Sequence, residues 1–142
     1  MKAFHLRLIL LACVPLVGAT GCGDGPSLVE ATGSVSYHGK PVAKASIVLQ
    51  PQEGPLATGI SDEQGVFSLA TRGRAGAVAG PATVAVTALE EVKSIPPGDE
   101  YPEGLHITRS RIPAKYALVA ASPLTVEVTP SGENHFELEL TD

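Results

Sequence analysis

From residue 30 onwards, apolar and polar side chains alternate with a period of two in short segments separated by Gly and Pro. The last segment is the clearest, because Phe136, Leu138 and Leu140 fall on one face and Glu137 and Glu139 on the other. Such alternation is typical of a strand with one buried and one solvated face. No segment shows a sustained helical period, so the pattern predicts an all-β fold. The seven predicted strands cover residues 30–37, 44–50, 56–61, 66–71, 82–89, 124–129 and 134–141.

The segments between these predicted strands have the composition of tight turns. Gly39 can take a positive φ and Pro41 fixes the exit of the first turn. In the segment 61–67, Asp62 is expected to hydrogen-bond its own loop and Gly65 to adopt the left-handed conformation. Residues 130–133 are expected to join the last two strands as a hairpin. Seven short strands with such turns predict a seven-stranded antiparallel β-sandwich.

The first 21 residues have the layout of an export signal. Lys2 and Arg7 supply positive charge, residues 8–17 are almost wholly apolar, and small residues follow. The apolar run is interrupted by Pro15 and is shorter than the roughly 20 residues that a membrane-spanning helix needs. We therefore expect a cleavable signal peptide over residues 1–21.

The signal ends in the run Val17-Gly18-Ala19-Thr20-Gly21-Cys22, which resembles the bacterial lipobox. The small side chains of Ala19 and Gly21 suit the peptidase that cuts before Cys22, and the thiol of Cys22 is the nucleophile that lipid transfer requires. The resemblance implies a bacterial protein that is exported and held at the membrane by lipid on Cys22, facing the periplasm or the cell surface. The alternative is cleavage by the ordinary signal peptidase, which would release a soluble protein with a free cysteine.

Composition agrees with this division of the chain. Removing 21 of the 142 residues leaves 121, which is one ordinary domain, and Cys22 is then the one remaining cysteine because Cys13 is removed. Loss of Lys2 and Arg7 lowers the basic residues from 10 to 8 against 15 acidic ones, so the formal charge becomes −7. Such a surface disfavours nucleic-acid binding. Residues 22–28 are expected to form the lipidated tether and 29–142 the β-sandwich domain.

Several short motifs follow one another along the chain. They are Gly33-x-Val35-x-Tyr37-x-Gly39-Lys40-Pro41-Val42, Gly59-x-Ser61-Asp62-x-x-Gly65-x-Phe67-x-Leu69 and Asn134-x-Phe136-x-Leu138-x-Leu140. Their order and spacing resemble the carboxypeptidase regulatory-like, or transthyretin-like, β-sandwich domain of bacterial lipoproteins. The resemblance spans nearly the whole mature chain and implies a small transthyretin-like or immunoglobulin-like sandwich of a group whose members mostly lack an assigned activity. It supplies no catalytic set.

The sequence offers no spacing typical of a catalytic or metal centre. His38, His106 and His135 lie in unrelated segments, and the Gly-x-Ser-x-Gly motif of serine hydrolases is missing. We therefore expect neither a catalytic residue, nor a metal, nor a cofactor, and a protein that is not an enzyme. A hydrolase is the least favoured class.

Residues 91–123 form a predicted connection of 33 residues between two strands, and structureless loops of this length are usually functional or disordered. If the protein has a partner site, we expect it here. The alternative is that Ile112, Tyr116 and Leu118 simply pin the loop across the sandwich. The candidate binding residues of this segment are Asp99, Glu100, Tyr101, Glu103 and Tyr116.

Two functions are weighed for this chain. The favoured one is a non-enzymatic, lipid-anchored cell-envelope protein with a structural or protein-interaction role. The alternative is binding of a small ligand, a glycan or calcium through the 91–123 loop, with Asp99, Glu100 and Glu103 as the calcium ligands and Tyr101 and Tyr116 as the sugar-stacking rings.

Overall fold

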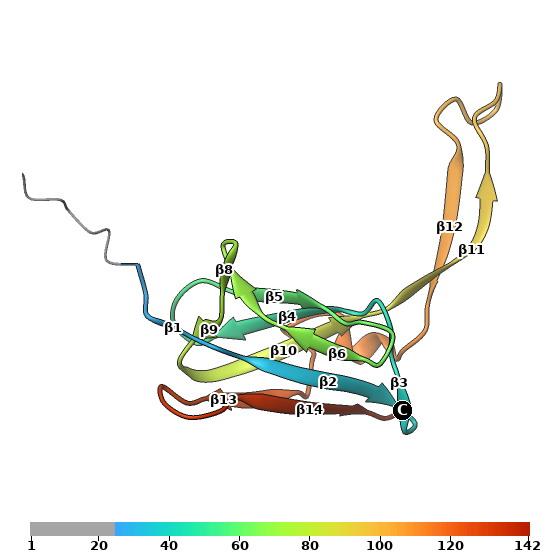
Figure 1. Ribbon diagram of the computed structural model, residues 1–142. Helices are drawn as coiled ribbons and strands as arrows, with labels where there is room; N and C mark the ends of the chain where they lie inside the picture. Colours follow the sequence, from blue (N-terminus) through green and yellow to red (C-terminus); the bar gives the residue numbers. More distant parts are fainter. Residues whose placement is uncertain (1–24) are drawn as a thin grey trace, which may run out of the picture.

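The computed structural model describes residues 25–142, so Ala19, Gly21, Cys22 and the predicted signal peptide lie outside the described residues. The described chain is an all-β fold with several sheets (Figure 1). Its elements are β1 (Leu28–Val29), β2 (Thr32–Tyr37), β3 (Lys40–Pro41), β4 (Ser46–Pro51), β5 (Ala57–Ile60), β6 (Val66–Ser68), β7 (Ala70–Thr71), β8 (Arg74–Ala75), β9 (Ala77–Val78), β10 (Gly80–Thr87), β11 (Leu89–Ile95), β12 (Leu105–Ser110), the 3₁₀ helix η1 (Ala114–Tyr116), β13 (Thr125–Val128) and β14 (His135–Leu140).

Two larger sheets make up the body of the molecule, which we define as residues 25–88 and 111–142. One has six strands in the order β13-β10-β4-β5-β7-β8. In the other, β2 lies between β14 on one side and β3 and β6 on the other. Their apolar side chains form one buried cluster, an arrangement consistent with a β-sandwich. The largest fully buried members are Val35, Ile47, Leu49, Val84, Val86, Val128 and Leu140.

The period-two pattern explains which side chains reach this core. In β4, Ile47 and Leu49 are fully buried while Val48 between them is partly exposed. In β14, Leu138 and Leu140 are buried and Glu137 and Glu139 exposed, as the sequence predicts. The alternation therefore assigns the faces of these strands correctly.

The predicted turns also form. His38 and Gly39 both have positive φ, at 50° and 74°, between β2 and β3. The Asp62 carboxylate accepts hydrogen bonds from the backbone N–H groups of Gln64 and Val66, both at 2.9 Å, and Gly65 has a φ of 76°. These contacts confirm the turn chemistry that the sequence predicts.

The predicted hairpin between the last two strands is wrong. β13 pairs antiparallel with β10, whereas β14 pairs parallel with β2, so the intervening turn carries the chain from one sheet to the other. The fold is therefore not wholly antiparallel. The side chain of Asn134, which is 5% exposed, holds this crossing by donating to the carbonyls of Glu30 and Thr129 and accepting from the Thr129 N–H.

The prediction of a structureless connection over residues 91–123 is also wrong. β11 and β12 form an antiparallel hairpin, and η1 follows it. β10 runs into β11 through the buried Ala88, whose carbonyl accepts a hydrogen bond of 2.8 Å from the Arg111 N–H. Ile112 and Tyr116 are buried in the core, as the pinning alternative predicts, but Leu118 is 66% exposed.

Leu28, the last residue of the predicted tether, belongs to β1 and pairs with Val78 of β9. The residues that the structure describes include no helix long and apolar enough to cross a membrane.

Candidate functional site

The projecting hairpin, residues 89–110, is the candidate interaction element. It extends away from the body, and only its base is packed against it (Figure 1). Cross-strand pairs run from Leu89 opposite Ser110 to Ile95 opposite Leu105, with a bulge that leaves Val92 unpaired. A two-stranded hairpin by itself is only marginally stable in water.

One face of the hairpin is polar. The His106 Nδ1 lies 2.7 Å from the Glu91 Oε2 and 3.2 Å from the Ser94 Oγ. Both contacts use the same ring nitrogen, whereas in a Ser-His-Asp triad the acid and the nucleophile contact opposite ring nitrogens. The three residues therefore stabilise the pairing of β11 with β12 and do not form a catalytic relay.

The opposite face is apolar towards the tip. The pairs Lys93–Ile107 and Ile95–Leu105 are two residues apart on each strand, so their side chains share this face. Ile107 is 41% exposed, and Ile95 and Leu105 are partly exposed. We call Ile95, Leu105 and Ile107 the apolar strip. Towards the base of the hairpin the Arg109 Nε donates to Glu90 at 3.0 Å.

Four of the five candidate binding residues lie together at the tip of the hairpin, in the connection 96–104. Asp99, Glu100, Tyr101 and Glu103 are all exposed there. The Tyr101 carbonyl accepts hydrogen bonds of 2.9 Å from the N–H groups of both Gly98 and Gly104, which closes the tip. This connection contains three acids and no base, so the tip is negatively charged.

Tyr116 is not part of this group. It is 2% exposed, and its hydroxyl donates to the Thr141 carbonyl and accepts from the Thr141 N–H, both at 2.9 Å. A ring buried in this way is unavailable for stacking on a sugar, so Tyr116 is a core residue and its assignment as a binding residue is corrected.

Across residues 25–142, no group of three or more His, Cys, Asp or Glu side chains is arranged to hold a metal ion. The histidines have separate partners: His38 contacts Asp142 at 3.0 Å, His106 contacts Glu91, and His135 contacts the Thr32 hydroxyl at 3.1 Å. Calcium binding by the three tip acids stays a prediction.

An exposed polar cluster lies where β2 meets the end of β14. The Tyr37 hydroxyl donates to the Asp142 carboxylate, and the Tyr37 and His38 rings are 4.2 Å apart. The hydrogen bond from Tyr37, followed by the His38 charge, lowers the pKa of Asp142, and the same hydrogen bond raises the pKa of Tyr37. The contribution of Asp142 to stability is therefore present above its ordinary pKa and lost as pH falls through the lowered one.

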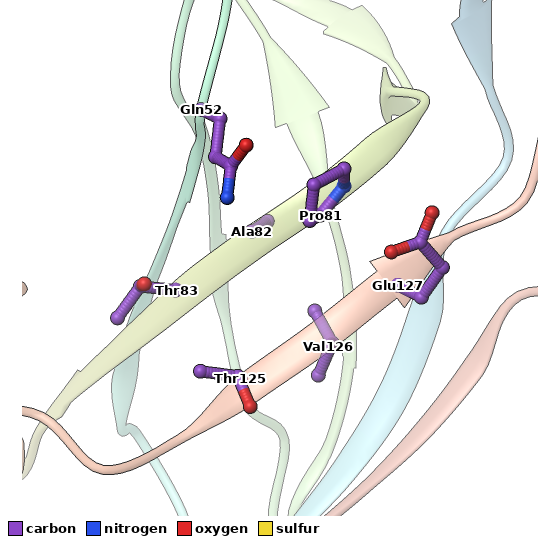
Figure 2. Close-up of a pocket in the computed structure, with 7 residues that line it drawn as sticks. All are labelled: Gln52, Pro81, Ala82, Thr83, Thr125, Val126 and Glu127. Carbon is purple, nitrogen blue, oxygen red and sulfur yellow. The ribbon is translucent and has the colours of Figure 1, made fainter.

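A shallow hollow of about 320 Å³ lies on the exposed side of the six-stranded sheet (Figure 2). Gln52 and Pro81 line one side and Glu127 the other, with Thr83 and Thr125 below them. Sequence reasoning missed it, because strands distant in the chain contribute these residues and none of them belongs to a motif. It is an open surface with no buried polar group pointing into it.

Comparison with known proteins does not identify a family for this chain. No family model and no curated protein matches the chain. Among solved structures, it is similar to the crystal structure of a 9R-lipoxygenase from Cyanothece PCC8801, with a TM-score of 0.34 and 13% sequence identity. The match covers 81% of this chain and only 16% of the lipoxygenase chain.

From the sequence we expect a chain that is not an enzyme, whereas this similar structure is that of an enzyme, so the expectation is withdrawn. A likeness with a TM-score of 0.34 is also too distant to make this chain an enzyme. The comparison therefore assigns neither the presence nor the absence of a catalytic activity.

Proposed function

We propose that this chain is a lipid-anchored cell-envelope protein, in which a transthyretin-like β-sandwich holds the projecting hairpin out as the contact element for another envelope protein. The lipobox-like run ending at Cys22 supports the anchor, and the motif order from Gly33 to Leu140 supports the family. The observation that carries the interaction role is the hairpin itself, whose two strands leave the body with both faces exposed (Figure 1).

The side chains exposed on the hairpin indicate what kind of surface the partner has. The apolar strip would be buried against an apolar surface, which would stabilise contact by about 25 cal/mol per Å². The acidic tip, with Asp99, Glu100 and Glu103, would repel an acidic surface and attract a basic one. The partner is therefore an envelope protein with an apolar strip bordered by basic side chains.

Polar substitution of the strip tests this proposal. In a Leu105→Ser/Ile107→Ser variant, we expect the amount of partner that co-purifies from detergent-solubilised envelopes to fall at least tenfold, because the apolar contact is lost. The body should keep its melting temperature within a few degrees, since both residues lie outside the core cluster. Quantitative mass spectrometry of the co-purified proteins measures the first effect and circular dichroism the second.

The matched control is Ile60→Ser, which removes an isoleucine that is 72% exposed on β5 of the body. It should leave the co-purified set unchanged. Equal recovery of every protein by the wild-type chain and the hairpin variant would contradict the interaction role of the hairpin.

A further inference from the structure

Two arginines lie directly beside the first residues that the structure describes. Arg72 lies in the turn between β7 and β8, Arg74 is the first residue of β8, and both are exposed. They line a small hollow together with Gly25, Pro26 and Leu28. A Cβ atom placed on Gly25 would be 3.4 Å from the Arg74 Nη1, so this guanidinium lies against the start of the domain.

Chain length then places these arginines relative to the anchor. Gly25 follows Cys22 by three residues, which span at most about 10 Å when fully extended. A lipid on the Cys22 sulfur holds that residue at the level of the headgroups. Charges more than about 8 Å apart are largely screened at physiological ionic strength, so Arg74 is within reach of headgroup phosphates whenever the tether is less than fully extended.

We propose that Arg72 and Arg74 bind the phosphates of anionic phospholipid headgroups and thereby orient the domain, with the projecting hairpin held away from the membrane. This inference rests on the lipid anchor of the proposed function. In Figure 1 the β7–β8 turn and the start of the described chain lie on the side of the body remote from the tip of the hairpin. A guanidinium suits phosphate because its planar fork of donors can bind two oxygens at once.

The charges around Arg72 and Arg74 determine whether these residues orient the domain or strengthen its attachment to the membrane. Within the part of the chain that the structure describes, neither arginine forms an ion pair. Pro55 of the β4–β5 turn lines the same hollow as the arginines, and Glu53 lies two residues before it. Asp24 precedes Gly25 in the sequence. With a formal charge of −7 on the mature chain, the domain as a whole is repelled by an anionic surface. The arginines therefore select one orientation and add little to the strength of the anchor.

Energy transfer on the lipidated mature chain tests the proposal. A Gly98→Cys substitution places a single reactive thiol at the hairpin tip, where nothing lies within 4 Å of an added Cβ, and Cys22 is blocked by its lipid. A fluorophore on this thiol reports its distance from acceptors in the headgroups of vesicles of phosphatidylethanolamine and phosphatidylglycerol. We expect low transfer in the wild-type background and higher transfer in an Arg72→Gln/Arg74→Gln variant.

Each arginine near an anionic surface changes a population about fivefold, so the double variant should lower the ratio of upright to tilted orientations roughly 25-fold. The matched control is Lys40→Gln/Lys44→Gln, which removes the same charge from exposed sites elsewhere on the body and should leave transfer low. Vesicles of phosphatidylcholine alone should raise transfer in the wild-type chain and abolish its difference from the arginine variant.

Equal transfer in the wild-type chain and the arginine variant, both bound to vesicles, would overturn the inference. A rise in energy transfer on Asp24→Asn substitution alone would also overturn the inference. The orientation of the domain would then depend on Asp24, and the arginines would be acting through it. Failure of the anchor is a separate result: a chain without lipid on Cys22 would not float with the vesicles in a density gradient, whatever its arginines do.

Discussion

A Cys22→Ala chain is expected to leave the membrane fraction almost completely. The thiol is the acceptor for lipid, and each methylene of an acyl chain contributes about 0.8 kcal/mol of membrane affinity, so two chains bind far more tightly than any surface patch on this acidic domain. The remaining chain carries a formal charge of −7, and nothing else predicted from its sequence would hold it at an anionic surface. Fractionation of cells by centrifugation, followed by immunoblotting, measures the change.

Cys13→Ala is the matched control, because it makes the same substitution inside the predicted signal peptide and should leave the protein in the membrane fraction. The intact mass of each purified chain shows whether the leader has been removed, so a variant retained by an uncleaved leader is recognised. A wild-type chain whose Cys22 carries no acyl mass would contradict the anchor directly.

An Asn134→Ala chain is expected to lose about 3 kcal/mol of folding free energy. Asn134 is buried and makes four hydrogen bonds, two from Nδ2 and two to Oδ1. Its removal breaks three part-buried bonds to the backbone of Glu30 and Thr129, at about 1 kcal/mol each. It also frees the turn that carries the chain between the two sheets. Urea denaturation of the chain measures the loss.

Ser131→Ala is the control for this substitution, since it lies in the same turn and is exposed. It should change the unfolding free energy by less than about 0.5 kcal/mol. If Asn134→Ala were equally mild, the side chain would not be holding the crossing, and the parallel pairing of β14 with β2 would have to be stabilised by apolar contacts alone.

The sequence predicts the strands of the body because burial on one face imposes a period of two. Leu138 and Leu140 alternate with glutamates for this reason, and Gly65 stands where the backbone requires a positive φ. The sequence does not predict which sheet each strand joins. The turn at 130–133 has the composition of a chain reversal, yet which strand β14 then joins depends on β2, about a hundred residues earlier, and local pattern carries no information on that pairing.

The projecting hairpin was harder to predict, for a physical reason. A hairpin that leaves the body has no face fixed by the core, and the bulge at Val92 breaks the alternation along β11. Its strands therefore lack the signal that identifies β4 or β14. Asp99, Glu100 and Glu103 lie together at the tip because they are close in the sequence. The burial of Tyr116 depends on what packs above its ring, which the sequence does not show.

The position of Arg72 and Arg74 in the fold also could not be predicted from the sequence. Nothing in the sequence places Arg74 beside Gly25, since 48 residues separate them and the contact depends on how β7, β8 and β1 come together. Only folding brings the positive charges of Arg72 and Arg74 close to Gly25, where the predicted tether leads into the domain.

Site-specific photo-crosslinking in living cells shows whether the projecting hairpin contacts another envelope protein. A photoreactive amino acid at Ile107, in the apolar strip of the hairpin, is compared with the same group at Ile60 on the body, both exposed isoleucines on strands. We expect the group at Ile107 to form a discrete crosslink to one envelope protein, which the Leu105→Ser substitution weakens, and the group at Ile60 to form none. Crosslinks to the same protein from Ile60 and not from Ile107 would contradict the proposed role of the hairpin.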